Sequence, residues 1–121
     1  MKRLTFVILA LLFCLSGCAA STADNASPDK LYRDDPLIDM FVFDSVAYVN
    51  ASDLEWVKEL ELTQDALLGS IKRTKVTKNF GQWDATTLPV GSEVYAVSGR
   101  QDILLAERDG ILAPYYAWRE G

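Results

Sequence analysis

The sequence predicts a mostly β domain: a small curled antiparallel sheet, barrel- or roll-like, with about five strands and one short helix. Runs rich in β-branched and aromatic residues are short, and turn signals separate them. One of these signals, Asp109-Gly110, is typical of a β-hairpin. Apolar residues fall on both alternations of several runs, which indicates strands covered on both faces, as in a sheet that curls on itself.

The N-terminal segment predicts export. Lys2 and Arg3 precede an apolar run over residues 4–15. A membrane span needs about 20 apolar residues, whereas the apolar part of a signal peptide needs only about 7 to 15. We therefore expect residues 1–17 to be a signal peptide that is removed.

Leu15, Ser16, Gly17 and Cys18 follow the apolar run directly and resemble the lipobox of bacterial lipoproteins. The resemblance implies cleavage before Cys18, a diacylglyceryl thioether on its sulfur, and further acylation of its new amino group. Because each buried CH₂ contributes about 0.8 kcal/mol, two or more chains anchor a protein stably. The expected location is the extracytoplasmic face of the cell membrane, with this covalent lipid and no other cofactor. An ordinary secretory signal, cleaved elsewhere, is the alternative.

The segment 18–36 is predicted to be a flexible spacer, because its only large apolar side chains are Leu31 and Tyr32. Residues 37–121 are then one small β-rich domain. Without the signal peptide the chain has 10 basic and 17 acidic residues, a net charge of −7. This acidic balance disfavours nucleic acid as a partner and predicts weak repulsion from an anionic membrane surface.

The first strand is expected over residues 37–49, where the pair Asp44 and Ser45 predicts a bulge or an edge. A short helix is expected next. Ser52 is its predicted N-cap, and Glu55 stands three residues later, as a capping box requires.

Residues 66–76 begin apolar and end basic, with Lys72, Arg73 and Lys75. An edge strand whose lysines discourage pairing with other chains is the main interpretation, because the charges fall on both alternations. The alternative is a partner-binding stripe.

Residues 78–88 are predicted to form a loop that leads back into the sheet. Phe80 and Trp83 have two interpretations. Folded inward, they close one end of the core, which is the favoured interpretation. Exposed together, they form a recognition platform for peptides or sugars.

The C-terminal part predicts three further strands, the last two joined by the Asp109-Gly110 hairpin. Pro114 is expected to confine the last strand to an edge or a bulge, since proline lacks the N–H that a ladder needs. The expected strands cover residues 92–97, 103–107 and 111–119, with turns at 88–91 and 98–102.

This C-terminal block is similar to a tail of small lipoproteins of unassigned function in Bacillus-like bacteria. The resemblance covers roughly the last third of the folded domain and carries no activity with it. It implies a β-hairpin unit in a small β-rich module, set on the outer face of a Gram-positive membrane. The residues that carry it are Leu88-Pro89-Val90-Gly91, Glu93-Val94-Tyr95, Asp102-Ile103-Leu104, Asp109-Gly110, Tyr116 and Glu120-Gly121.

Few catalytic chemistries are open to this chain. It has no histidine, which removes the Ser-His-Asp and Cys-His arrangements and most transition-metal sites. Lipid consumes Cys18, and Cys14 leaves with the signal peptide, so no thiol nucleophile or cysteine metal site remains. A carboxylate pair could cleave a glycosidic bond if the two groups lie about 5 to 10 Å apart. We name no catalytic residue and no metal ligand.

The sequence therefore predicts a membrane-tethered, non-catalytic binding or accessory module that contacts an envelope protein or cell-wall material. Its tether would favour weak contacts near the membrane by raising the effective concentration. The alternatives are a carboxylate-based hydrolase of cell-wall polymer and a structural or inhibitory lipoprotein with one dedicated partner. The candidate partner-binding residues are Phe80, Trp83, Lys72, Arg73 and Lys75.

Overall fold

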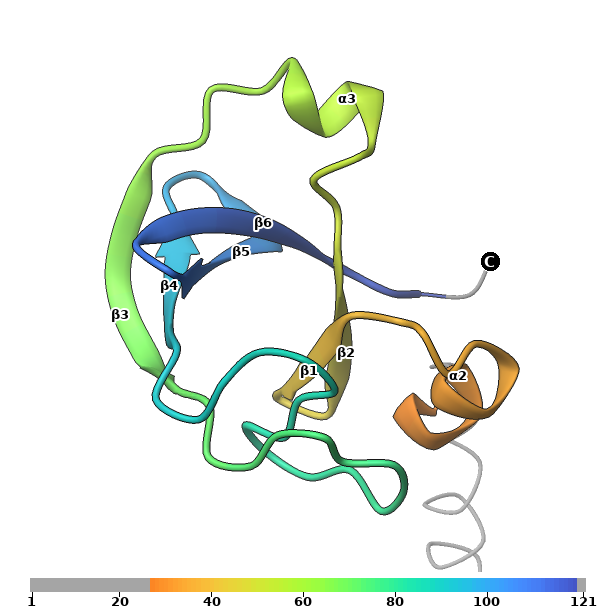
Figure 1. Ribbon diagram of the computed structural model, residues 1–121. Coiled ribbons are helices and arrows are strands. Elements are labelled where there is room, and N and C mark those ends of the chain that lie inside the picture. The colour runs from red at the N-terminus through yellow and green to blue at the C-terminus, as the bar shows by residue number, and fades with distance from the viewer. Residues whose placement is uncertain (1–26, 120–121) are drawn as a thin grey trace, which may run out of the picture.

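The computed structural model describes residues 27–119, in which six strands form one sheet and two helices are short. All neighbouring strands are antiparallel, in the order β1-β2-β6-β5-β4-β3, and the sheet curls into a half-barrel (Figure 1). The predicted mostly β class with a curled antiparallel sheet is confirmed. The elements are α2 (Pro28–Asp34), β1 (Met40–Phe43), β2 (Val46–Asn50), α3 (Glu55–Lys58), β3 (Gln64–Ser70), β4 (Glu93–Val97), β5 (Arg100–Arg108) and β6 (Ile111–Ala117).

The strand expected over residues 37–49 is in fact two strands joined by a tight turn. Phe43 pairs with Val46 across this turn. Asp44 and Ser45 between them have φ values of 54° and 63°. Two consecutive positive φ angles are the mark of a type I′ turn, whose twist suits a hairpin. The predicted bulge or edge at this pair is therefore wrong, and the split supplies the sixth strand.

The Asp109-Gly110 hairpin is confirmed. These residues have φ values of 53° and 79°, and Arg108 pairs with Ile111 across the turn. Another short turn, with Gly99 at a φ of 78°, joins β4 to β5. The turn expected over 98–102 is therefore shorter than predicted, and β5 begins at Arg100.

Pro114 was expected at an edge or a bulge, but β6 lies inside the sheet between β2 and β5. Pro114 aligns with Leu105 of β5, and its carbonyl accepts a hydrogen bond from the N–H of Ala51 at 2.9 Å. The N and O of a residue in an antiparallel strand face the same side, so the missing N–H faces a point just past the end of β2. Because β2 ends at Asn50, no ladder bond is lost there, and an interior strand tolerates the proline.

The capping box predicted for the short helix after β2, with Ser52 as its N-cap, is wrong. The N–H of Ser52 donates to the side-chain oxygen of Asn50 at 2.9 Å, which folds a turn before the helix. The N-cap of α3 is Leu54, two residues later, and no side chain caps the helix. Its one buried residue, Val57, packs on the outer face of the sheet with a small apolar cluster: Ala51, Val97, Ile103 and Leu105.

The segment 28–34, expected to be part of a flexible spacer, instead forms helix α2. The carboxylate of Asp29 accepts hydrogen bonds from the backbone N–H groups of Asn79 at 2.7 Å and Phe80 at 3.1 Å. The ring of Tyr32 also contacts that of Phe80, with centroids 6.1 Å apart. These contacts to a distant loop offset the entropy that the spacer prediction set against ordering this segment.

The predicted signal peptide over residues 1–17, the lipobox Cys18 and the first part of the spacer lie outside the described residues. Within residues 27–119, no helix is long and apolar enough to cross a membrane.

Candidate functional site

The interior of the half-barrel has a covered end, where the segment 71–88 lies between the edges of β1 and β3. The N–H of Val42 donates to Asp84 O at 2.9 Å, and that of Trp83 donates to Val42 O at 2.8 Å. The indole of Trp83 lies against Gly69 of β3, where an added Cβ would sit 2.5 Å from Cζ2 of the ring. Backbone bonds and one aromatic ring thus close the gap between the two edge strands.

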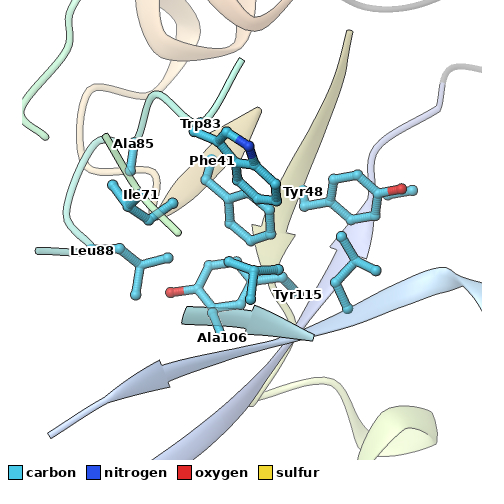
Figure 2. Packing of buried hydrophobic residues seen from close by; sticks show 11 residues of the cluster. Phe41, Tyr48, Ile71, Trp83, Ala85, Leu88, Ala106 and Tyr115 are labelled. Atoms are coloured by element: carbon cyan, nitrogen blue, oxygen red, sulfur yellow. The ribbon is translucent and has the colours of Figure 1, made fainter. Parts of the chain in front are cut away.

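The covered end holds most of the apolar core (Figure 2). Phe41 lies at its centre, with ring centroids 5.1 Å from Tyr115, 5.5 Å from Tyr48 and 6.4 Å from Trp83. The cluster comprises Phe41, Tyr48, Ile71, Trp83, Ala85, Leu88, Val94, Leu104, Ala106, Tyr115 and Ala117.

The buried hydroxyl of Tyr115 at the covered end has a polar partner, whereas the buried hydroxyl of Thr74 in segment 71–88 has none within residues 27–119. The hydroxyl of Tyr115 donates to the Asp39 carboxylate, at 2.9 Å from Oδ2, and Asn50 Nδ2 donates to the same oxygen at 2.9 Å. Burial, and after it the Asp39 charge, raises the pKa of Tyr115. The phenol therefore stays protonated and acts as a structural donor.

The five predicted partner-binding residues all lie in segment 71–88, but they do not form one exposed patch. Trp83 is only 6 % exposed, so the favoured interpretation of an inward-folded ring holds for it. Phe80 is half-buried beneath α2. Lys72, Arg73 and Lys75 are exposed.

Arg73 is engaged in an ion pair within the loop. Its Nε donates to Oδ1 of the buried Asp84 at 2.8 Å, and its Nη2 bonds to Oδ2. This pairing lowers the pKa of Asp84, which also accepts the N–H of Gly81. The predicted edge strand is confirmed as β3, but β3 ends at Ser70, so the basic residues follow the strand instead of lining it.

The other end of the interior is open and forms a groove of about 480 Å³. This volume is within the range of small-molecule sites, roughly 300 to 1,000 Å³. The groove is set between the tip of the β1–β2 hairpin and the start of β5. Its apolar lining residues are Phe43, Val46, Tyr48, Ala96 and Leu104, and its polar ones are Asp44, Arg100, Gln101 and Arg119.

Tyr48 connects the core to the groove. Its ring stacks on Phe41 at an interplanar angle of 12°. Its hydroxyl and that of Tyr115 point to opposite sides of the cluster (Figure 2). Within residues 27–119 the Tyr48 hydroxyl has no hydrogen-bond partner. Burial raises the pKa of Tyr48, and the charge of Arg119 opposes that rise.

Charges on the groove are balanced. Arg100 binds Asp102 through two bonds of 3.0 and 2.8 Å, and its guanidinium also lies 5.8 Å from the ring of Trp56. The bond from Arg100 lowers the pKa of Asp102. Arg119 and Asp44 are exposed on the same rim, one of each sign. The groove therefore offers donors, acceptors and an aromatic wall without a net charge.

The sequence did not single out the groove residues. Phe43, Val46 and Tyr48 read as ordinary core positions, and Arg119 as a strand end. One sequence feature could have pointed to the groove: two arginines, Arg100 and Arg119, stand near apolar strand residues in a chain that is acidic overall. Among the described residues, no three histidine, cysteine or acidic side chains come together where they could hold a metal ion.

The wall of the groove is apolar and aromatic, and its rim carries both hydrogen-bond donors and acceptors. No protein-family model matches this chain, and no curated protein or solved structure matches it either.

Proposed function

We propose that this protein is a membrane-tethered extracytoplasmic lipoprotein whose β-rich domain is a non-catalytic binding or accessory module. The resemblance of Leu15-Ser16-Gly17-Cys18 to a lipobox supports the tether. The observation that carries the binding role is the open groove, which is lined by Tyr48, Arg119 and Asp44. Within residues 27–119 the Tyr48 hydroxyl has no hydrogen-bond partner.

The groove favours a ligand with an apolar body and both donor and acceptor groups. An envelope protein segment and cell-wall material both have this chemistry. A polyanion such as nucleic acid does not suit it, because the rim carries acids as well as arginines and the whole chain has a net charge of −5. A lipid tether would hold the domain in a thin layer where such weak contacts are favoured.

Three carboxylates, those of Asp39, Asp84 and Asp102, favour binding over hydrolysis. A glycosidase needs one acid with a raised pKa, so that it can donate a proton. Their arginine partners lower the pKa of Asp84 and Asp102 instead. Asp39 accepts bonds from Tyr115, Asn50 and Thr87, which uses its oxygens in the fold.

The tether is tested by growing the producing cells with labelled palmitate and comparing the full chain with a Cys18→Ala variant. We expect label on the wild-type protein and none on the variant. An unlabelled wild-type protein that is still secreted would mean an ordinary signal peptide and would overturn the lipoprotein assignment.

The groove is tested with a photocrosslinking amino acid at Gln101, on the rim, and at Ile111, an exposed matched position away from it. The acylated protein is irradiated in its own membrane with the cell wall present. We expect crosslinks at 101 to one envelope protein or to insoluble peptidoglycan, and far fewer at 111. Equal yields at both positions, or none at either, would remove the groove as the binding site.

The hydrolase alternative has its own test. Purified cell-wall sacculi are incubated with the protein, and soluble fragments are measured by chromatography. We expect no release of soluble fragments, whether or not the protein binds the sacculi. Release that depends on one carboxylate, judged by Asp→Asn variants, would favour the hydrolase.

A further inference from the structure

Charge is unevenly distributed along the folded chain. The segment 53–65, which contains α3, has five acidic residues and one lysine. The segment 71–83, which follows β3, has four basic residues and no acid. An overall negative charge therefore conceals a basic region.

The two segments lie on opposite sides of the molecule. In Figure 1, α3 is at the top of the view, and the green loop after β3 crosses the bottom. Lys72, Lys75 and Lys78 in that loop are exposed. Arg73 is also exposed but is paired with Asp84, so the three lysines are the groups that can meet a partner.

The chain leaves the described domain beside this basic segment. Helix α2 begins at Pro28, and the next residue, Asp29, is bonded to the N–H groups of Asn79 and Phe80. The segment 28–35 contributes two basic and three acidic residues. With this segment, Asp84 and Asp44 included, because the N–H of Asp44 donates to Gln82 Oε1, the basic side keeps a net charge of +1.

We propose that Lys72, Lys75 and Lys78 contact the anionic headgroups of the membrane that holds the lipid tether. The domain then rests with the loop 71–80 toward the bilayer and the acidic segment 53–65 away from it. This inference depends on the proposed tether, which would emerge on the same side. The sequence predicted that the acidic domain is weakly repelled from an anionic membrane. Because its basic and acidic segments lie on opposite sides, we instead expect the membrane to attract one side of the domain and repel the other, which orients it.

The strength of the contact follows from membrane electrostatics. A lysine near an anionic leaflet strengthens binding about five-fold, and the field falls off within a Debye length of about 8 to 10 Å at physiological salt. Three lysines give an effect of about two orders of magnitude. A tether that begins beside them would bring them within that distance.

The test uses acylated protein in lipid nanodiscs that carry a headgroup quencher. Since lipid would consume Cys18, a single label can be placed at Thr77→Cys in the basic loop or at Thr63→Cys in the acidic segment. Both threonines are exposed. Discs contain either about 30 % phosphatidylglycerol or phosphatidylcholine alone.

We expect stronger quenching at position 77 than at 63 on anionic discs, and no such difference on neutral discs or at about 1 M salt. The triple variant Lys72→Glu, Lys75→Glu, Lys78→Glu should abolish the difference. Lys58→Glu, on α3, should preserve it. Circular dichroism checks that each variant is folded, and a Lys→Gln triple variant should weaken the difference without reversing charge.

Equal quenching at 77 and 63 on anionic discs, or a difference that survives charge reversal, would overturn the orientation. Failure of the tether gives a different result. A chain that is not acylated is missing from the discs altogether, whereas a wrongly oriented domain stays on them with no dependence on label position.

Discussion

The two ends of the half-barrel interior differ in how their tyrosines are used. Tyr115, at the covered end, donates to Asp39 at 2.9 Å. Tyr48, at the open end, is 6 % exposed, and its hydroxyl faces a groove of about 480 Å³. Both rings pack on Phe41, so the two ends share one core. One sheet thus builds a packed core and an open groove from the same residue types.

The difference comes from what covers each end. At the covered end the segment 71–88 forms backbone bonds to β1, and Trp83 packs on Gly69. The buried Tyr115 beneath that cover donates to Asp39, whose side chain is 20 % exposed. At the open end the cover stops, and the rim groups Arg119 and Asp44 remain in solvent. Four predictions test this contrast, beginning with the largest effect.

Removing the indole that covers the core should have the largest effect. Trp83→Ala is expected to lower the free energy of unfolding by about 3 to 5 kcal/mol, because it leaves a cavity between β1 and β3. Trp118→Ala is the matched control, since Trp118 is 42 % exposed, and should cost about 1 kcal/mol or less. Urea denaturation measures both. Similar losses for the two would mean that Trp83 does not close the barrel.

The two tyrosine hydroxyls should differ next. Tyr115→Phe removes a bond to a carboxylate and is expected to cost about 1.5 to 3 kcal/mol of stability. Tyr48→Phe should change stability by no more than about 0.5 kcal/mol, because its hydroxyl has no partner within residues 27–119. A double-mutant cycle with Asp39→Asn should show coupling for Tyr115 alone. Coupling of Tyr48 to Asp39 would contradict the division into two ends.

The ion pairs of the two ends should respond differently to acid. The Asp84 side chain is 3 % exposed and that of Asp102 is 39 % exposed, so the first pair is screened less. Asp84→Asn is expected to cost about 1 to 2 kcal/mol at neutral pH, and Asp102→Asn about 0.5 kcal/mol or less.

The sign of the pH dependence follows from the lowered pKa of Asp84. A carboxyl whose folded pKa lies below the usual 3.8 stabilises the fold above that value, and this stabilisation is lost as the pH falls through the folded pKa. Stability of the wild type should therefore fall on the acid side, and Asp84→Asn should flatten that fall. If the stability of Asp84→Asn fell with decreasing pH as much as that of the wild type, the Arg73–Asp84 pair would not contribute to stability. Thermal unfolding between about pH 7 and pH 2 makes the measurement.

Arg119→Ser should have the smallest effect on stability, within about 0.5 kcal/mol, because the side chain is exposed. The charge of Arg119 lowers the pKa of Tyr48, so its removal should move the titration of that phenol to higher pH. NMR of the labelled tyrosine ring detects the shift, with Tyr115 as internal reference. An unchanged Tyr48 titration would place Arg119 away from the groove.

Prediction from sequence worked best where the determinant is local. The predicted Asp109-Gly110 turn holds, and an edge strand does lie in the region predicted over residues 66–76, although β3 ends at Ser70 and does not include the basic residues. Prediction failed where a distant contact decides the conformation. Pro114 tolerates an interior strand because β2 ends beside it, and α2 forms because Asp29 reaches residues about 50 positions away.

The candidate site shows the same division. The sequence singled out Phe80, Trp83 and three basic residues and favoured an inward position for the two aromatic side chains, which holds for Trp83. It gave no sign that Arg73 pairs with the buried Asp84, because the two residues are 11 positions apart in the chain. The groove was not predicted, because its lining comes from four separate segments of the chain.

By itself, the sequence determined the mostly β class, the Asp109-Gly110 turn and an acidic net charge, since strand propensity, turn chemistry and charge depend on neighbouring residues. The tertiary structure alone decided which end of the half-barrel is closed. That choice depends on backbone bonds between Val42 and Asp84 and on an indole packed against Gly69. Such contacts join residues far apart in the chain, and they form only once the sheet has curled enough to bring its two edges together.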